Sequence, residues 1–263
     1  MTRTALTIAG SDSGGGAGIQ ADLKTFAVHG VFGTSAITAL TAQNTTGVSR
    51  ILAVPPDMVV AQIDAVMTDL GADAIKIGML ADAAIAEAVA GALRHYRVSN
   101  VVLDTVMVAK GGARLLDDAA IAVIRERLLP LATVVTANVP EAEVLTGLRL
   151  HSVAALRQAA RRLIEMGAAA VVVKGGHLDG PAIDVFDDGV AVIELEGPRI
   201  PTVHTHGTGC TMAAAIAAHL ALGRSLSEAV AAAKRYVARA IERAPGLGRG
   251  HGPLGWGESL TGD

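Results

Sequence analysis

Short runs of β-branched and other apolar residues alternate with longer segments in which apolar residues recur every three or four positions. The short runs predict strands at Ala5–Ala9, Ser35–Thr41, Ala74–Met79, Val101–Thr105, Thr133–Thr136, Ala170–Lys174 and Ala191–Leu195. The longer segments predict helices at Ile19–Val28, Pro56–Leu70, Ala83–Tyr96, Asp118–Leu129, Val153–Met166, Thr211–Leu222 and Leu226–Ala244. This alternation predicts an α/β fold of three layers, in which helices cover both faces of a central, mostly parallel sheet.

Polar and glycine residues mark the ends of these elements. Ser152 and Ser225 are expected helix caps, and several helices are expected to stop at the glycines Gly30, Gly71, Gly167 and Gly223. The segment Pro181–Pro201 departs from the alternation and predicts a hairpin of two short strands around Asp187-Asp188-Gly189. Because the chain contains no linker, low-complexity tract or internal repeat, residues 1–263 are expected to form a single domain.

Composition narrows the class of protein. Only six of the 263 residues are aromatic, so the core must be built from Val, Ile, Leu and Ala, as in buried parallel strands. A formal charge of −3 disfavours nucleic-acid binding, and the chain lacks an apolar stretch of the roughly 20 residues that cross a membrane. One cysteine excludes an internal disulfide and any multi-cysteine metal site. With a poor secretory signal at the N-terminus, the chain is expected to be a soluble cytoplasmic protein.

The residues with candidate chemistry come just after predicted strands. They are the loop Ser11–Gly18, the pair Gln43-Asn44, Asp104, Asn138 and Lys174. In mostly parallel sheets, ligands bind outside the carboxyl ends of the strands, so these side chains are expected to surround one site.

The strongest local signal is His206-Gly207-Thr208-Gly209-Cys210-Thr211, which opens a helix of small residues. The glycines allow several backbone N–H groups to converge on one anion at the positive end of the helix. The same end would favour the thiolate of Cys210. The alternative is a glycine-rich turn that carries a buried structural cysteine.

The loop Gly10–Gly18 contains Gly16-Ala17-Gly18-Ile19-Gln20-Ala21, which fits the dinucleotide fingerprint. That fingerprint requires an acidic residue about 20 positions later, and none lies between Asp22 and Asp57. The sequence also lacks a Walker A phosphate loop and the H-E-x-x-H and G-x-S-x-G signatures of hydrolases. A nicotinamide oxidoreductase is therefore disfavoured, while a purely structural glycine loop stays open.

Four further residues could hold phosphate or metal, and three of them have a structural alternative. Asn138 and Glu141 could bind a metal-bound phosphate, but the same spacing forms an ordinary helix capping box. Lys174 could neutralise a phosphate or extend its ammonium to solvent at a strand end. Asp104 ends an apolar strand and should project into the site, with Met107–Gly112 following as a candidate flap.

Taken together and in order, these motifs resemble one family. The matching segments are Leu6–Thr25, Ala42–Thr45, Lys76–Leu80, Leu103–Lys110, Val173–His177, His206–Thr211 and Gly250–Pro253. They resemble the hydroxymethylpyrimidine and phosphomethylpyrimidine kinases of thiamine biosynthesis, a branch of the ribokinase superfamily close to the pyridoxal kinases. The resemblance spans residues 4–256 and implies a ribokinase-like fold and a homodimer.

The resemblance implies two ATP-dependent phosphorylations, first of 4-amino-5-hydroxymethyl-2-methylpyrimidine and then of its monophosphate. It implies that Gln43 pairs with a ring nitrogen and the exocyclic amine, and that Asp22 accepts from that amine. It places Gly10, Met79 and Val106 around the pyrimidine ring. Lys174, Asn138, Glu141 and Thr208 would hold ATP and its Mg²⁺, with Asp104 and Glu141 near the metal. Gly207, Thr208, Gly209 and Cys210 would form the anion hole for the phosphoryl group.

Cys210 stands where most sugar kinases of the superfamily carry an aspartate base. A thiolate could take the alcohol proton in the first step, whereas the second acceptor is already an anion. Cys210→Ser is therefore expected to harm the first phosphorylation more than the second. Two alternatives stay open, a pyridoxal/pyridoxine kinase and a pyrimidine-binding sensor without turnover; retention of Gln43 favours the pyrimidine.

Overall fold

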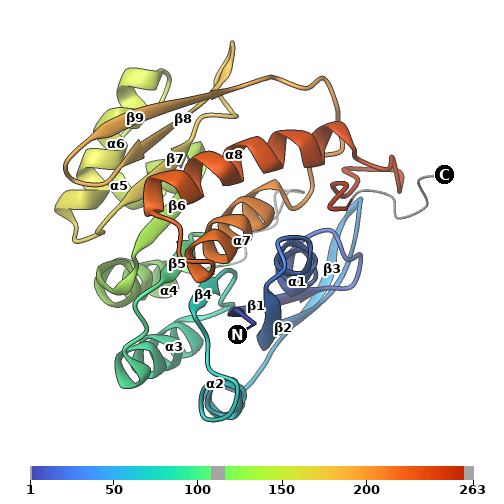
Figure 1. Cartoon of the computed structure of the whole chain (residues 1–263), viewed down its shortest axis with the longest axis vertical. Helices are drawn as coiled ribbons and strands as arrows, with labels where there is room; N and C mark the ends of the chain where they lie inside the picture. Colours follow the sequence, from blue (N-terminus) through green and yellow to red (C-terminus); the bar gives the residue numbers. More distant parts are fainter. Residues whose placement is uncertain (1, 108–115, 258–263) are drawn as a thin grey trace.

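The computed structural model describes residues 2–107 and 116–257, and within them nine strands form one sheet (Figure 1). The strands are β1 (Thr4–Asp12), β2 (Phe32–Asn44), β3 (Gly47–Ala53), β4 (Ala74–Ile77), β5 (Val101–Asp104), β6 (Val134–Asn138), β7 (Val171–Lys174), β8 (Ala182–Asp187) and β9 (Val192–Gly197). Their order across the sheet is β3-β2-β1-β4-β5-β6-β7-β8-β9. The six strands from β2 to β7 in this order are parallel, and β3, β8 and β9 pair in the antiparallel sense.

Helices cover both faces of the sheet, which gives the predicted three-layer α/β/α arrangement (Figure 1). The helices are α1 (Gly18–Val28), α2 (Pro56–Met67), α3 (Ala83–Tyr96), α4 (Asp118–Val123), α5 (Val139–Thr146), α6 (Val153–Glu165), α7 (Thr208–Ala221) and α8 (Leu226–Glu242). One face carries α1, α7 and α8, and the other carries α2 to α6.

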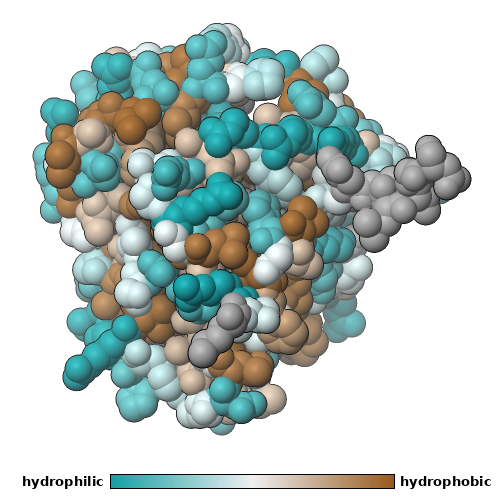
Figure 2. Space-filling model, in the orientation of Figure 1, coloured by the Kyte–Doolittle hydropathy of each residue, from teal (hydrophilic) through white to brown (hydrophobic). Residues whose placement is uncertain are grey.

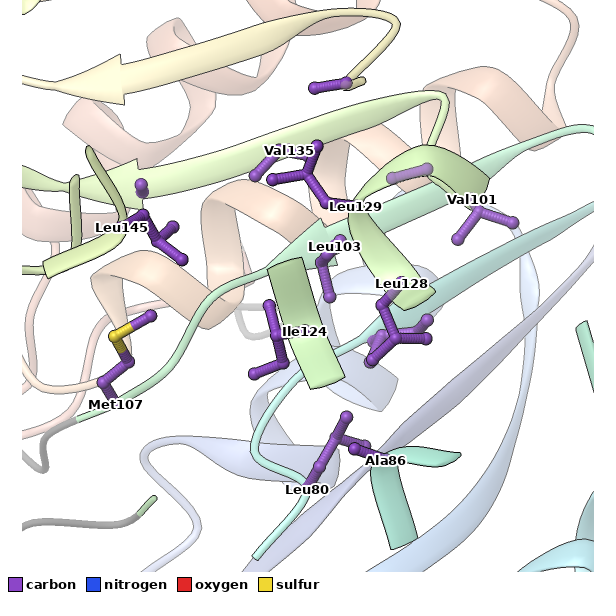
Figure 3. Packing of buried hydrophobic residues seen from close by; sticks show 14 of the residues in the cluster. Leu80, Ala86, Val101, Leu103, Met107, Ile124, Leu128, Leu129, Val135 and Leu145 are labelled. Atoms are coloured by element: carbon purple, nitrogen blue, oxygen red, sulfur yellow. The ribbon is translucent and has the colours of Figure 1, made fainter. Parts of the chain in front are cut away.

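Alternate residues of each strand pack against the helices on opposite faces of the sheet. In β5, Val101 and Leu103 pack with the helices of one face, whereas Val102 packs with α7 on the other. Figure 3 shows Leu103 among Ile124 and Leu128 on the first face. On the second face α7 is buried on every side from Thr211 to Ala221, between the sheet and α8. Its alanines leave room for this close packing and explain a core with so few aromatic side chains.

Most predicted elements are present, and the helix ends follow the predicted signals. Ser152 accepts from Ala155 N at 3.2 Å, and Ser225 forms a capping box with Glu228. Gly30, Gly71, Gly167 and Gly223 all have positive φ. The predicted hairpin around Asp187-Asp188-Gly189 is the β8–β9 pair.

The structure differs from the prediction in four places. Strand β3 and helix α5 were not predicted, because β3 is an exposed edge strand and α5 has only eight residues. Helix α7 begins at Thr208 and not at Thr211, because Gly207 serves as its N-cap. The single helix expected over Asp118–Leu129 is α4 followed by a π-helical turn (Ile124–Leu128), with a 3₁₀ turn (Leu129–Leu131) after it.

The surface of the face in Figure 2 intersperses hydrophilic and hydrophobic residues. Among the helices of the described residues, none is both long enough and apolar enough to cross a membrane.

Candidate active site

A cavity of about 640 Å³ lies at the carboxyl ends of β1, β5, β6 and β7. The chain leaves β1 for β2 on one side and later returns to place β4 on its other side, so the cavity meets the sheet at a topological switch point. All the residues with a predicted catalytic, substrate, nucleotide or metal role line this cavity except Asp22. Of the loop Ser11–Gly18 and the pair Gln43-Asn44, residues 13–16 and Asn44 do not line it. The last residues of the predicted flap, Val108–Gly112, lie outside the described residues.

The predicted anion hole is the start of α7. Gly207 has φ +83°, and a Cβ built there would lie 1.8 Å from the carbonyl oxygen of Gly16. Only glycine fits this position, where the loop after β1 packs directly against the loop before α7. No residue in the described part of the chain accepts a hydrogen bond from Gly209 N–H or Cys210 N–H. These two donors at the positive end of a 14-residue helix can bind an anion.

Lys174 and Asp104 lie directly beneath the anion hole. Lys174 Nζ is 3.0 Å from Asp104 Oδ1, which also accepts from Thr136 Oγ1 at 2.7 Å. A Cβ on Gly209 would come within 3.2 Å of Lys174 Nζ and 3.5 Å of Asp104 Oδ2. Burial disfavours the charged ammonium, but the carboxylates of Asp104 and Glu141 outweigh burial and raise the pKa of Lys174. The lysine therefore brings a permanent positive charge to the anion hole.

Asn138 and Glu141 form the capping box of α5 and also line the cavity. Asn138 Oδ1 accepts from Glu141 N at 2.9 Å, and Glu141 Oε2 accepts from Asn138 N at 2.8 Å. The structural alternative is therefore confirmed, and it places both side chains at the cavity wall. Burial, assisted by the charge of Asp104, raises the pKa of Glu141 to about 7. Lys174 opposes this rise without overcoming it.

Cys210 lies in the first turn of α7, but the predicted preference for a thiolate is wrong. Burial raises the pKa of the Cys210 thiol to about 11, and the ammonium of Lys76 only partly offsets the rise. Desolvation of a buried anion here exceeds the stabilisation that a helix N-terminus supplies. Cys210 is thus a thiol at neutral pH.

The residues predicted to contact the substrate divide into two groups. Gln43, Gly10, Met79 and Val106 line the cavity, and a Cβ on Gly10 would lie 3.2 Å from Met79 Sδ. Asp22 is fully buried below the cavity, with Oδ2 2.8 Å from Lys76 Nζ and 2.6 Å from Thr7 Oγ1. This placement does not agree with direct contact between Asp22 and a pyrimidine amine, because the carboxylate has no exposed surface.

Sequence reasoning assigned no role to Lys76, Asp12 or His206, which all line the cavity. Lys76 lies between Ile75 and Ile77 in a fully buried strand, and a lysine at such a position indicates a paired internal charge. Asp12 Oδ2 lies 2.9 Å from His206 Nε2, and these residues come from the two glycine loops that pack together. The pairing is invisible in sequence, because 194 positions separate the two side chains.

The cavity holds charged groups for a phosphate but no ready-made metal cage. Among the residues that the structure describes, no three His, Cys, Asp or Glu side chains gather closely enough to hold a metal ion. Asp104 Oδ2 is buried and has no hydrogen-bond partner in the described part of the chain. Such an oxygen can accept a hydrogen bond or bind a cation.

The fold is shared with solved vitamin kinases. A pyridoxal kinase from Bacillus subtilis, solved as an ADP complex, superposes with a TM-score of 0.91 at 40% identity and covers 97% of each chain. A phosphomethylpyrimidine kinase from Clostridium difficile superposes with a TM-score of 0.82 at 40% identity, over 91% of this chain and 100% of the other. The architecture is therefore ribokinase-like.

Sequence comparison defines the family within this class. The model of the phosphomethylpyrimidine kinase family matches residues 12–255, and the chain belongs to that family. It is 52% identical over 253 residues to a hydroxymethylpyrimidine/phosphomethylpyrimidine kinase from Synechococcus elongatus, covering 95% of this chain and 96% of the relative. It is also 56% identical over 250 residues to the thiamine biosynthesis bifunctional protein ThiED of Geobacter sulfurreducens, covering 95% of this chain. The chain spans 51% of the length of that bifunctional relative.

Proposed function

We propose that this protein transfers a phosphoryl group from ATP to 4-amino-5-hydroxymethyl-2-methylpyrimidine and then a second one to the monophosphate formed. The proposal rests on one juxtaposition. A single cavity contains both an anion hole backed by Lys174 and a carboxamide, Gln43, that can pair with an aminopyrimidine. Membership in the phosphomethylpyrimidine kinase family supports the same substrates.

The geometry suits phosphoryl transfer, which depends mainly on positioning and on charge neutralisation. The substrate hydroxyl oxygen would attack the terminal phosphorus of ATP while the bond from that phosphorus to the bridging oxygen breaks. The N–H groups of Gly209 and Cys210 would donate to the transferring phosphoryl oxygens, with Lys174 directly below. Asn138 and Thr208, which both line the cavity, would position the remaining phosphates of the nucleotide.

The residues present fit a Mg²⁺ ion that arrives with ATP. Mg²⁺ in kinases is held by one or two carboxylates together with substrate phosphates and waters. The unpartnered oxygen of Asp104 and the neighbouring carboxyl of Glu141 are ligands of this kind. When bound, the ion would neutralise phosphate charge, and Asp104 and Glu141 would hold it.

Cys210 could take part in the first transfer only, because only the alcohol has to lose a proton. With a pKa of about 11, the thiol must first be deprotonated. A thiolate formed at this site would be a strong base for the alcohol proton. The second acceptor is a phosphate oxygen that already carries negative charge. The second phosphoryl transfer would therefore depend on the anion hole and Lys174 alone.

We also propose that the chain acts as a homodimer whose contact includes the β3 edge of the sheet. Leu52, Ile51 and Leu40 are 66%, 43% and 47% exposed on β3 and its neighbour β2. An exposed edge strand with apolar side chains is a site for association. The continuous sheet supports a single domain over residues 1–263, and the cytoplasmic location stays a prediction.

The test is the mass of the product after purified protein is incubated with ATP, Mg²⁺ and hydroxymethylpyrimidine. We expect the pyrimidine diphosphate. A parallel incubation with pyridoxal tests the alternative, which the likeness to solved pyridoxal kinases supports. Pyridoxal phosphate as the only product would overturn the assignment of Gln43. Substrate binding without ATP consumption would point to a sensor.

A further inference from the structure

Asp12 connects the loop after β1 to the anion hole. Its carboxylate accepts from Gly14 N, Gly16 N and Ala17 N at 2.8, 3.0 and 2.8 Å, and it lies 2.9 Å from His206 Nε2. Burial alone would raise the pKa of Asp12, but hydrogen bonds from His206 and Gly14 lower it. Asp12 is therefore a carboxylate, which can only accept hydrogen bonds.

This pairing determines the hydrogen position on His206. Because Asp12 can only accept, His206 Nε2 must carry a hydrogen and donate it to Asp12, whether the ring is neutral or charged. A protonated ring nitrogen has no lone pair to offer. Its single hydrogen points at Asp12, so a second group beside Nε2 cannot donate to this nitrogen and can only share the hydrogen as an acceptor.

The group on that side is the carboxamide of Gln43. Its nitrogen lies 3.2 Å from His206 Nε2, so that two donors face each other. Its oxygen lies 3.2 Å from Thr41 Oγ1, whose one hydrogen is already donated to Ser11 O at 2.8 Å. Half a turn of the carboxamide removes both conflicts, because the nitrogen then donates to Thr41 and the oxygen shares the His206 Nε2 hydrogen with Asp12 in a three-centre hydrogen bond.

We propose that Asp12 and His206 are positioning residues that hold the oxygen of the Gln43 carboxamide on the His206 side, and that this orientation fixes which way round an aminopyrimidine binds. The inference rests on the proposed function. It adds Asp12 and His206 to the residues that recognise the substrate, and it specifies the orientation in which Gln43 binds the pyrimidine.

The orientation has a chemical consequence for the reacting group. With one oxygen lone pair facing His206 and one N–H facing Thr41, the other lone pair and N–H form an acceptor–donor edge toward the cavity. A ring nitrogen would take the N–H, and the exocyclic amine would donate to the oxygen on the His206 side. The hydroxymethyl group is on the ring carbon next to the amine, so it would lie on that same side. His206 directly precedes Gly207, and the hydroxyl would thus face the anion hole.

The test compares hydroxymethylpyrimidine with 5-(hydroxymethyl)-2-methylpyrimidine, which lacks the amine. In the wild type, kcat/KM should favour the amino compound. In His206→Met, which has no donor, we expect this preference to fall about tenfold, as for loss of one oriented hydrogen bond. His206→Gln, which restores an N–H donor at similar reach, should recover the preference.

Two further variants separate positioning from structure. In a Gln43→Ala background, His206→Met should leave the preference unchanged, because the group it orients is gone. Thr41→Val removes the second anchor and should lower the preference even if His206→Met does not fold. His95→Met, at an exposed histidine of α3, is the matched control and should change neither rate.

An equal fall of kcat/KM for both compounds in His206→Met and in Thr41→Val would assign a purely structural role and overturn the inference. Failure of the wild type to phosphorylate hydroxymethylpyrimidine would instead overturn the proposed function. The two failures are thus distinguishable.

Discussion

At the scale of single residues, burial decides the protonation of the groups around the anion hole. Lys174 stays charged because two carboxylates surround it, whereas Glu141 and Cys210 have raised pKa values because each is an acid removed from water. The raised values make two pH dependences testable.

The first concerns Cys210. If its thiolate accepts the alcohol proton, the rate of the first phosphorylation should rise about tenfold per pH unit between pH 8 and 10, because the thiolate fraction grows up to a pKa of about 11. The second phosphorylation should stay flat over this range. Cys210→Ser should abolish the rise and harm the first step more than the second. Single-turnover measurements of both steps check this, and equal losses in the two rates would contradict it.

The second concerns Glu141, whose pKa is about 7. Below this pH the carboxyl becomes neutral and attracts a cation less strongly, so the KM for ATP with Mg²⁺ should rise as pH falls from 8 to 6. Glu141→Gln should have a high KM throughout and no such dependence. The measurement is steady-state kinetics with varied ATP at fixed excess Mg²⁺. A variant that keeps the wild-type pH dependence would exclude Glu141 from this role.

At the scale of elements, the sequence was informative where local signals determine structure. Caps at Ser152 and Ser225 and stops at glycine were predicted because each acts within a few residues. Helix α5 was missed because it has only eight residues, although its capping box was one interpretation of Asn138 and Glu141. Strand β3 was missed because its positions are exposed and do not alternate between buried and polar residues. Asp22 could not be placed, because its burial depends on the pairing of Asp22 with Lys76 across 54 positions.

The start of α7 offers a test that separates chemistry from folding. Gly209 has no positive φ, so alanine suits its helix, but the new Cβ would crowd Lys174 Nζ at 3.2 Å and contact Asp104. We expect Gly209→Ala to keep a Tm within a few degrees of the wild type and to lose more than about tenfold in kcat. Gly91→Ala, in α3 with nothing near its Cβ, should gain about 1 kcal/mol of stability and keep its activity. Thermal unfolding and steady-state kinetics on the same preparations test both expectations.

At the scale of the whole molecule, the two edges of the sheet differ in degree. On the β3 edge Leu52 is 66% and Ile51 43% exposed, whereas on the opposite edge strand, β9, Val192 and Ile193 are 40% and 39% exposed and follow a turn at Val190. We expect Leu52→Glu to convert a dimer into 26.6 kDa monomers, because the charge would be buried in the contact. Val190→Glu should leave the dimer intact. Light scattering after size-exclusion chromatography measures both, and a wild-type monomer would refute the proposed dimer.

A buried histidine should make the free energy of unfolding sensitive to acid. His219 packs against His29 where α1, α7 and α8 meet, and burial lowers the pKa of His219 to about 4. An unfolded histidine binds a proton near pH 6.5, so the free energy of unfolding should fall between pH 6.5 and about 4. The difference corresponds to roughly 3 kcal/mol at most. His219→Leu should flatten this slope in urea denaturation, and an unchanged slope would rule out the histidine as its source.

The strand order also determines when the active site can form. Among the described strands, the neighbours in sequence that pair in the antiparallel sense are β2–β3, β7–β8 and β8–β9, and they lie at or near opposite edges of the sheet. Each parallel pair of strands can form only after the crossover segment that joins the two strands is in place. The pairing of β1 with β4 also requires β2, β3 and α2, which lie between them in the chain. The centre, where the two glycine loops meet, is therefore assembled from the most distant segments. During refolding, hairpins at the margins should appear early, and the ability to bind a phosphate should be acquired last.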